Sequence, residues 1–542
     1  MLTSILYLTP EATKYASFEV PKKNGGMRVI SAPFPQLKYL QQRLSALLYA
    51  CFEERIADNP HRAASQYGYI KGRSVEDNAN RHRSRRYVLN VDLADFFQAI
   101  NFGRVRGFFI ADSGFALSPE VATTIAQIAC WNNGLPQGSP CSPIISVLVG
   151  GILDRRLAAL AREHSCTYTR YVDDLTFSTK ANSFPTELAN FDADEGKWVA
   201  GPQLVHAVEK AGFTINTVKT RLFARTGRQS VTGLVINRKV NVNRNYEMRV
   251  RAAFHRYCRT GNYVVPGSLE KMVAEEEAEL ETTIHRLEGM FQWIFRIKDF
   301  ADQRKEGSKR NNPTAFRRVY RDFLFAKHFL FMEKPIIICE GKTDNVYIGS
   351  ALKKLAAQFP SLARWNGDEF QRLVRMFNYN HKSLEVLHVG GGSGDLAQLV
   401  REYRRLWARL ARRKVTYPVI MVVDNDDGGK AVFKAIKDVG GPDIAIGDPT
   451  LLFHAFHNLY LVKTPHAGTT PKSCIEDLFD TATLASPVGG KTFKASCDGE
   501  TDEYFGKKIF AEAIVRPNWK QINFTRFEPL LNAIEQAIAK YV

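Results

Sequence analysis

The sequence lacks the features of a membrane-bound or secreted protein. Its 542 residues contain no run of eighteen or more apolar residues, so no segment has the character of a membrane-spanning helix. The first ten residues, Met1–Pro10, lack the charged start and the small-residue cleavage site of a secretion signal. We therefore expect a cytoplasmic protein with no membrane partner.

Cysteine is also scarce. The eight cysteines are scattered, and none belongs to a Cys-x-x-Cys pair or to a zinc-binding spacing. They are best interpreted as reduced thiols, which agrees with a cytoplasmic location. The sequence has no internal repeat or long low-complexity tract either, and this argues against a solenoid.

Acidic residues are outnumbered by basic ones. The chain has 56 Asp and Glu against 74 Lys and Arg, which gives a formal net charge of +18. This excess predicts a polyanionic partner. The length exceeds that of a usual single hydrophobic core, so two or more domains are expected.

The most informative segment is Tyr-Val-Asp-Asp at residues 171–174. Predicted strands at 167–172 and 175–178 would turn at Asp173 and Asp174 and present a carboxylate at the tip of a hairpin. We expect the small β-branched Val172 to fit the first strand. Carboxylate oxygens are the ligands that Mg²⁺ prefers, although a single Asp-Asp pair is more often an ordinary polar turn.

Upstream segments strengthen the metal interpretation. An apolar strand ends at Asp92, a Gly- and Pro-rich turn occupies 134–140, and an apolar run covers 144–153. Taken in this order with Asp173 and Asp174, these segments resemble the palm of a reverse transcriptase over roughly the first 240 residues. The resemblance implies an RNA-directed DNA polymerase that uses deoxynucleoside triphosphates and two Mg²⁺ ions. It makes Asp92, Asp173 and Asp174 the catalytic metal ligands.

The resemblance also implies a substrate site, formed by Lys23, Arg28, Asp95, Phe97 and Gln137. Phe97 would clash with a ribose 2′-OH, and Gln137 would line the incoming nucleotide. Lys23 and Arg28, in a predicted hairpin of the fingers, would contact the triphosphate. Simpler interpretations stay open: a core phenylalanine, a turn residue and a solvated basic turn.

Two short motifs resemble those of bacterial retron reverse transcriptases. They are Asn-Ala-x-x-His at 78–82 and Val-Thr-Gly at 231–233. This resemblance implies a structured noncoding RNA as partner, with Asn78 and His82 in its binding site. It also implies a branched RNA–DNA product, called msDNA. Group II intron and diversity-generating reverse transcriptases would share the carboxylates, but they do not normally carry the C-terminal region described next.

The pattern changes to long helical segments after residue 240. The stretch 246–257 is strongly basic and includes Arg249 and Arg251, and a second helical stretch at 269–297 contains the acidic run Glu275–Glu277. Residues 241–331 resemble a polymerase thumb and linker, in which the two arginines would contact phosphates. Residues 298–313 are either a flexible loop or part of an RNA-binding surface.

A second α/β pattern begins near residue 332. Apolar strands at 335–340 and 418–423 each end in carboxylates, namely Glu340 and then Asp424 and Asp426, and a helix is predicted at 345–358. Continuous apolar strands that alternate with helices predict a parallel sheet covered on both faces. Functional groups gather beyond the carboxyl ends of such strands, so these carboxylates should converge.

This arrangement resembles a TOPRIM domain, particularly that of OLD-family nucleases. The resemblance places the domain core at 332–465 and its extension at 466–542. It implies a Mg²⁺ or Mn²⁺ site formed by Glu340, Asp424 and Asp426, with Asp344 as a further candidate. Glu476 and Lys507 resemble later elements of these nucleases, although a helix cap and a surface lysine explain them equally well. The glycine cluster at 389–394 is interpreted as a strand-to-helix turn.

Together the motifs predict a multidomain α/β protein. A right-hand-like reverse transcriptase occupies 1–240 as fingers and palm, and its helical thumb precedes the TOPRIM domain. By resemblance, the chain would make msDNA and carry a nuclease toxin that cleaves a nucleic-acid target in antiphage defence. The alternatives are a TOPRIM unit that only binds nucleic acid or assists assembly, and an RNA-binding scaffold without catalysis. A homo-oligomer is left open.

Overall fold

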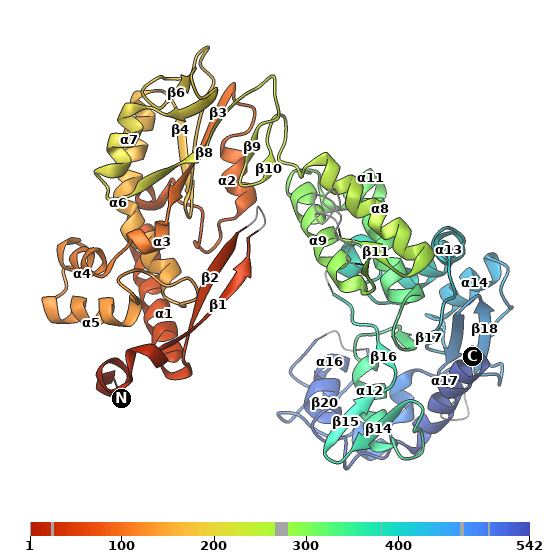
Figure 1. The fold of residues 1–542 in the computed structure, drawn as a ribbon. Coiled ribbons are helices and arrows are strands. Elements are labelled where there is room, and N and C mark those ends of the chain that lie inside the picture. The colour runs from red at the N-terminus through yellow and green to blue at the C-terminus, as the bar shows by residue number, and fades with distance from the viewer. Residues whose placement is uncertain are drawn as a thin grey trace. The chain divides into compact units, whose positions relative to one another are not determined.

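The protein divides into two compact units (Figure 1). The computed structural model describes residues 2–22, 26–265, 280–380, 382–466, 471–496 and 499–541. Unit 1 contains residues 1–244 and 296–302, and unit 2 contains residues 245–295 and 303–542. Lys23 and the acidic run Glu275–Glu277 lie outside the described residues. Within the described ranges, no helix combines the length and apolarity needed to cross a bilayer.

A four-stranded antiparallel sheet forms the centre of unit 1. Its strand order is β4-β5-β3-β8, with β3 at Tyr87–Ala94, β4 at Thr167–Tyr171, β5 at Asp174–Thr179 and β8 at Thr214–Ala224. The burial of β3 largely alternates, as expected for a strand with one face toward the core. Helix α6, Ser142–Glu163, contains the apolar run at 144–153, and its buried N-terminal half packs in the same core as the sheet.

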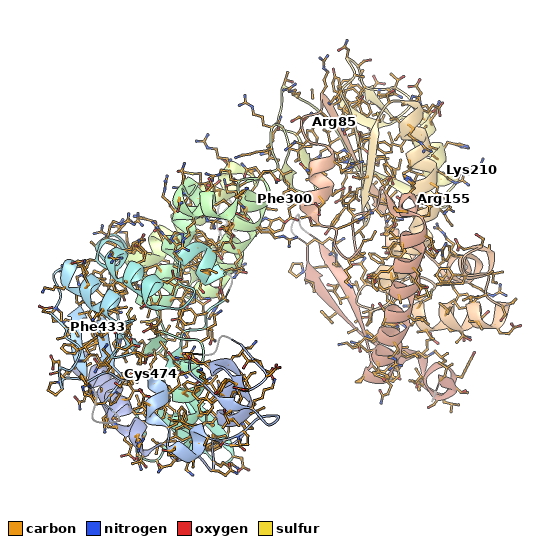
Figure 2. The ribbon with its side chains drawn as sticks, turned by 180° about the vertical axis from the view of Figure 1, so that it is seen from behind. Arg85, Arg155, Lys210, Phe300, Phe433 and Cys474 are labelled. Atoms are coloured by element: carbon orange, nitrogen blue, oxygen red, sulfur yellow. The ribbon has the colours of Figure 1, made fainter. Side chains whose placement is uncertain are left out.

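Smaller elements surround this sheet. The strand pairs are β1 Tyr15–Pro21 with β2 Met27–Pro33, β6 Ala189–Asp192 with β7 Lys197–Ala200, and β9 Ser230–Val231 with β10 Leu234–Val235. The helices are α1 Pro35–Asp58, α2 Val75–Arg81, α3 Phe96–Ala99, α4 Phe102–Ala111, α5 Pro119–Ala129 and α7 Pro202–Glu209. Local sequence explains several helix starts, since Ser74, Asn101 and Ser118 each accept a backbone N–H at the first turn. Arg155 and Lys210, labelled in Figure 2, are exposed on this unit.

Helix α2 is attached to the sheet by buried polar side chains. The two ring nitrogens of His82 lie 2.7 Å from the hydroxyls of Ser178 and Thr169, and the Thr169 hydroxyl donates to Asn78 Oδ1 at 2.6 Å. Burial lowers the pKa of His82 to about 3, with nearby arginines adding to the effect, so the ring is neutral. Asn78 and His82 are both 0% exposed, and their predicted part in RNA binding stays a prediction. In the structure, their side chains join α2 to β4 and β5.

The main sheet of unit 2 has five strands in the order β16-β13-β17-β19-β18. The bounds are β13 Ile336–Cys339, β16 Arg375–Met376, β17 Val419–Val423, β18 Leu452–Phe456 and β19 Leu459–Lys463. Strand β13 runs parallel to β16 and β17, and β17 runs parallel to β19. The parallel sheet is therefore confirmed, and β13 and β17 are buried throughout. Only the edge strand β18 runs antiparallel to its neighbour.

Helices and short hairpins complete unit 2. The helices are α8 Arg244–Thr260, α9 Ile284–Phe300, α10 Glu306–Asn311, α11 Ala315–Phe325, α12 Asp344–Lys354, α13 Ser393–Leu410, α14 Lys430–Asp438, α15 Thr481–Leu484, α16 Lys507–Ile509 and α17 Glu528–Tyr541. The remaining strand pairs are β11 Tyr263–Val264 with β12 Leu280–Glu281, β14 Ala363–Asn366 with β15 Glu369–Arg372, and β20 Thr492–Phe493 with β21 Tyr504–Phe505. Helices α8 and α11 and most of α9 belong to the same compact unit as the five-stranded sheet.

Helix α8 is amphipathic. Its buried residues follow the spacing of one helical face: Val250, Ala253, Phe254, Tyr257 and Cys258. The Phe254 ring packs against Phe291 of α9 and Phe323 of α11, with centroids 5.6 and 5.5 Å away. Arg249 is exposed and Arg251 is half-buried.

Candidate active sites

The first set of carboxylates gathers at one end of the unit 1 sheet. Asp92 of β3 lies directly opposite Asp174 of β5 in the antiparallel register. The backbone N–H of Leu93 donates to the carbonyl oxygen of Asp173 at 3.0 Å, so Asp173 is held beside the same strand. The structure therefore brings Asp92 together with Asp173 and Asp174, which lie more than eighty positions further along the sequence.

Val172 occupies a turn and not the strand that the sequence predicted. Strand β4 ends at Tyr171, and Val172 has a φ of 61°, in the left-handed region. A β-branched residue is a strong outlier there, at a cost of about 1–3 kcal/mol. Close packing helps to maintain the turn: a Cβ on Gly68 would lie 2.7 Å from Val172 Cγ2 and 2.8 Å from its backbone nitrogen. Only glycine fits at position 68 without movement.

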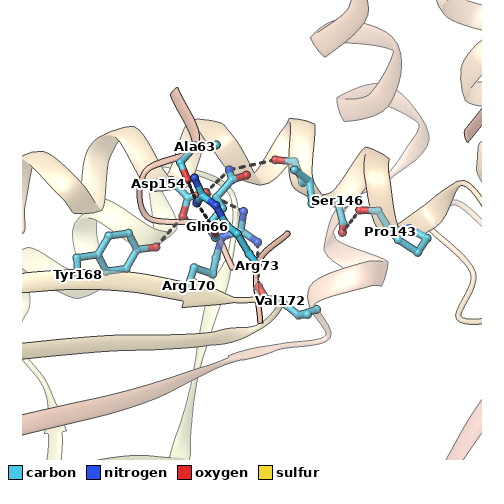
Figure 3. Close-up of polar contacts among 10 residues, drawn as sticks. Ala63, Gln66, Arg73, Pro143, Ser146, Asp154, Tyr168, Arg170 and Val172 are labelled. Carbon is cyan, nitrogen blue, oxygen red and sulfur yellow. Dashed lines mark hydrogen bonds and ion pairs between the residues drawn. The ribbon is translucent and has the colours of Figure 1, made fainter. Parts of the chain in front are cut away.

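A buried ion pair between Arg170 and Asp154 lies next to this turn. Arg170 Nε donates to Asp154 Oδ1 at 2.9 Å, and Arg170 Nη2 donates to Asp154 Oδ2 at 2.7 Å. Both residues are buried, at 3% and 4% exposed. The remaining lone pairs of Asp154 accept from Tyr168 Oη at 2.8 Å and from Gln66 Nε2 at 2.5 Å (Figure 3). The carboxylate is thus satisfied by neighbours, as a buried charge requires.

The same arginine reaches the strained turn. Arg170 Nη1 donates to the carbonyl oxygen of Val172 at 2.9 Å, as Figure 3 shows. Helix α6 makes room for the guanidinium at Gly150, where an added Cβ would lie 2.6 Å from Arg170 Nη2. Since α6 also provides Asp154, this helix determines where the Asp173–Asp174 turn lies.

Mutual repulsion and burial act on these carboxylates. Burial raises the pKa of Asp174 to about 7, and the charges of Asp173 and Asp92 add to the effect. The pKa of Asp173 is raised by burial and then by Asp92. A cation would relieve this repulsion.

Lys219 of β8 already places a positive charge in this set. Its Nζ lies 3.0 Å from Asp92 Oδ2, and Asn216 Nδ2 donates to the same oxygen at 3.3 Å. Lys219 was not among the site residues predicted from the sequence. Its position beside Asp92 follows from the pairing of β8 with β3, which no local pattern in the sequence indicates.

A cavity of about 400 Å³ adjoins the carboxylates. Asp92, Asp174 and Lys219 line one part of it, and Thr232 and Gly233 line another. The Val-Thr-Gly motif therefore contributes to the surroundings of the first carboxylate set.

Of the predicted substrate residues, Asp95 and Phe97 directly follow β3, and Arg28 lies on β2. Asp95 is exposed and precedes α3 with a φ of 44°. Phe97 is half-buried, and its ring packs edge-on against Phe96 and Tyr69. Arg28 is exposed on β2, near enough for its charge to lower the pKa of Asp173 against the larger effect of burial.

The turn that contains Gln137 packs against β2. The backbone N–H of Ser31 donates to the Gln137 carbonyl at 2.7 Å, and Gly138 has a φ of 128°. A Cβ on Gly138 would lie 2.5 Å from the Ser31 carbonyl oxygen, so this close approach requires glycine. The turn and the β1–β2 hairpin therefore form one surface.

A second set of carboxylates lies at the carboxyl ends of β13 and β17. Glu340 follows β13, and Asp344 begins α12 and accepts the Gly341 N–H at 2.6 Å. Asp424 follows β17, and its Oδ1 accepts from Thr464 Oγ1 at 3.0 Å and from the Ile475 N–H at 2.9 Å. The position beyond parallel strands matches the expectation for functional groups in such sheets.

These side chains also influence one another. Burial raises the pKa of Asp424 to about 8, and Asp344, Glu476 and Glu340 add to the effect. Burial and then Asp426 raise the pKa of Glu340. Asp426 Oδ1 accepts the Gly429 N–H at 3.1 Å, which orients its carboxylate.

Glu476 and Lys507 join this set. Lys507 Nζ lies 3.0 Å from Glu476 Oε2, and the Glu476 side chain is only 3% exposed. The capping residue of this helical turn is Asp477, whose side chain accepts the Cys474 N–H at 2.8 Å. Glu476 is therefore a buried partner of a lysine and not a helix cap.

The glycine cluster borders the second set. Gly391 and Gly392 have positive φ angles of 105° and 93°, and the Gly392 N–H donates to the Glu340 carbonyl at 2.7 Å. The prediction of a strand before the cluster is wrong, because a π-helical turn at Ser383–Leu387 precedes it. The cluster does lead into a helix, α13.

Both sets have the chemistry of divalent metal sites. Their donors are carboxylate oxygens, which suit Mg²⁺ and Mn²⁺. Glu340 Oε2 is buried and accepts no hydrogen bond from any residue in the described ranges. Among the described residues, neither set contains three carboxylates whose oxygens all lie within 4.8 Å of one another. Three of these carboxylates can therefore bind one ion together only after their rotamers change.

Comparison with known proteins places the first set within a known family. Residues 20–241 match the family described as reverse transcriptase (RNA-dependent DNA polymerase). The retron Mx65 reverse transcriptase of Myxococcus xanthus is 36% identical over 264 residues, which cover 45% of this chain and 56% of that protein. The retron Mx162 reverse transcriptase of the same organism is 35% identical over 266 residues, with coverages of 45% and 53%.

A relative from Escherichia coli is matched over more of its length. The retron Ec86 reverse transcriptase is 30% identical over 245 residues, which cover 45% of this chain and 69% of that protein. The chain spans a little over half the length of the two Myxococcus relatives. The matched family region ends at residue 241, before the five-stranded sheet of unit 2.

Removing the buried carboxylate under the turn should destabilise unit 1. Asp154→Ala leaves the Arg170 guanidinium buried without its counter-charge, so the free energy of unfolding should fall by about 3–5 kcal/mol. Urea denaturation followed by hydrogen exchange of unit 1 peptides measures the change. The control is Asp58→Ala at the exposed end of α1, expected to shift stability by less than about 0.5 kcal/mol. Equal stability of the two variants would contradict this role of Asp154.

Proposed function

Since the chain belongs to the retron reverse transcriptases, we propose that unit 1 is an RNA-directed DNA polymerase. Its template is a structured noncoding RNA, its substrates are deoxynucleoside triphosphates, and its product is branched msDNA. The observation that carries the proposal is the meeting of Asp92, Asp173 and Asp174 within the segment that matches the family.

Each group near the carboxylates has a distinct task. Asp92, Asp173 and Asp174 would hold two Mg²⁺ ions, which supply charge stabilisation to the attacking and leaving oxygens. Lys219 balances the charge of Asp92. Arg28 contacts the triphosphate from β2, and Lys23 is assigned the same role from its sequence alone.

Sugar and base recognition involve other residues. Phe97 excludes a ribose 2′-OH by its bulk, and the turn around Gln137 borders the incoming nucleotide. Asp95 is the exposed polar residue beside Phe97. Exposed Arg249 and half-buried Arg251 of α8 contact phosphates of the nucleic acid, an interaction that weakens as salt is added.

Loss of one central carboxylate should abolish polymerisation. Asp173→Asn removes a negative ligand, so primer extension with Mg²⁺ on an RNA template should fall at least roughly a hundredfold. Extension of a labelled primer by the purified full chain measures this, and Asp58→Asn serves as an exposed, remote control. Extension by Asp173→Asn within about twofold of the wild-type rate would refute the assignment of the first set.

For unit 2, we propose a TOPRIM-like nuclease site. The support is the convergence of Glu340, Asp344 and Asp424 beyond parallel strands, with Asp426 nearby and the Glu476–Lys507 pair beside them. Glu340, Asp424 and Asp426 would hold Mg²⁺ or Mn²⁺, which would polarise a phosphate ester for hydrolysis. Lys507 would stabilise negative charge on that phosphate.

The two activities together suggest an antiphage device. We propose that msDNA, made and retained by the chain, restrains the unit 2 site as a toxin, and that damage to msDNA during infection releases cleavage of cellular nucleic acid. The alternative is that unit 2 only binds nucleic acid or assists assembly into an oligomer. Glu340 Oε2 is buried and accepts no hydrogen bond from the described residues, which favours a metal-dependent nuclease over this alternative.

A cleavage assay separates these two functions of unit 2. The nuclease proposal predicts cleavage of DNA or transfer RNA by the full chain with Mn²⁺ after msDNA is digested, and its loss on addition of EDTA. Glu340→Gln should reduce cleavage at least roughly a hundredfold. Asp443→Asn, an exposed residue paired with Lys437, is the control. Binding of nucleic acid without any Mn²⁺-dependent cleavage would establish the alternative.

A further inference from the structure

Residues 65–69 form a short loop that runs along β4 and ends beside the first carboxylate set. Residues 65–67 run along β4, because the Arg170 N–H donates to the Ser65 carbonyl at 2.7 Å and the Tyr67 N–H donates to the Arg170 carbonyl at 2.9 Å. Gly68 then packs against the Val172 turn. The next residue, Tyr69, is thereby carried to the end of the sheet where the carboxylates meet.

Tyr69 has an uncommon backbone conformation. Its φ is 60°, in the left-handed region that few non-glycine residues adopt. The Tyr49 hydroxyl of α1 donates to the Tyr69 carbonyl at 3.0 Å and fixes this geometry. Such outliers persist where the surroundings determine them, and they concentrate at functional sites.

The Tyr69 ring contacts the proposed sugar-discriminating residue. Its centroid lies 6.4 Å from that of Phe97, with the ring planes at 62°, an edge-to-face arrangement. Phe97 also contacts Phe96 at 5.6 Å, so it lies between a core ring and Tyr69. Tyr69 is 42% exposed, which leaves part of its ring open to a ligand.

The surroundings of the Tyr69 phenol belong to the same site. Burial raises its pKa, Asp173 and Tyr171 add to the effect, and Arg28 opposes it. The phenol therefore lies within electrostatic range of both a proposed metal ligand and the proposed triphosphate contact.

We propose that Tyr69 is a positioning residue that holds Phe97 in place and forms a second wall for the sugar of the incoming nucleotide. Discrimination between deoxy- and ribonucleotides then depends on both rings. This inference rests on the proposed polymerase function. Removal of the Tyr69 ring leaves Phe97 free to rotate away from the sugar, so that a 2′-OH is accommodated.

The test is single-nucleotide incorporation by the full chain on an RNA template, with dGTP and GTP in parallel. Tyr69→Ala should lower the ratio of kcat/KM for dGTP over GTP by about 2- to 12-fold, the range expected for one aromatic contact. Most of the change should come from a lower KM for GTP. Tyr69→Phe keeps the ring and should retain the wild-type ratio.

A double-mutant cycle identifies the route of the effect. If Tyr69 acts partly through Phe97, Tyr69→Ala should change the ratio less when Phe97→Ala is present than it does alone. Tyr39→Ala, an exposed tyrosine on α1, is the matched control and should leave the ratio unchanged. Hydrogen exchange of unit 1 peptides checks folding, and Tyr69→Leu replaces the alanine variant if that variant does not extend primers.

Several outcomes would overturn the inference. They are an unchanged ratio in Tyr69→Ala, full additivity with Phe97→Ala, or loss of extension in both Tyr69→Ala and Tyr69→Leu. These outcomes differ from failure of the proposed function, in which the wild-type chain itself incorporates no dGTP.

Discussion

The buried ion pair between Arg170 and Asp154 is the interaction on which the first carboxylate set depends. A guanidinium in the core needs a carboxylate partner, and helix α6 supplies it. The same guanidinium holds the Val172 carbonyl, so the strained turn before Asp173 is tied to the helix. The local sequence does not favour a left-handed valine, so the turn depends on this link. Strain at the turn is thus maintained by a buried electrostatic contact and by the close approach of Gly68.

Both units use a similar principle to gather like charges. In unit 1, antiparallel pairing sets Asp92 opposite Asp174. In unit 2, parallel pairing of β13 with β17 brings Glu340 and Asp424 to the same sheet edge. The backbone pairing in each sheet overcomes the repulsion between carboxylates, and the raised pKa values of Asp174 and Asp424 reflect burial together with that repulsion. Lys219 and Lys507 each balance part of the negative charge. Divalent cations would balance the rest, which connects the folds to the proposed chemistry.

Much of the strand framework could be predicted from local sequence. Apolar strands that end in acidic residues correctly indicated β3, β13 and β17, and the hairpin around Asp173 and Asp174 was expected within two residues of its observed bounds. The reason is that hydrophobic periodicity and turn composition are local properties. The site roles of these residues stay predictions.

The errors concern contacts between distant segments. The left-handed turn at Val172 depends on Arg170 and on the loop at Gly68, and neither can be inferred from residues 171–174 alone. The hydrogen bonds that join Asn78 and His82 to the hydroxyls of β4 and β5 likewise could not be inferred from residues 78–82 alone. Lys219 was missed because its partner, Asp92, is 127 positions away.

We propose that each unit holds its own divalent-ion site. Mn²⁺ binding to the nuclease-treated full chain, followed by electron paramagnetic resonance, tests this claim without any catalytic readout. If this is correct, Asp173→Asn removes one group of bound ions, Asp424→Asn removes another, and the double variant loses both. Equal Mn²⁺ binding by the wild-type chain and the double variant would contradict it.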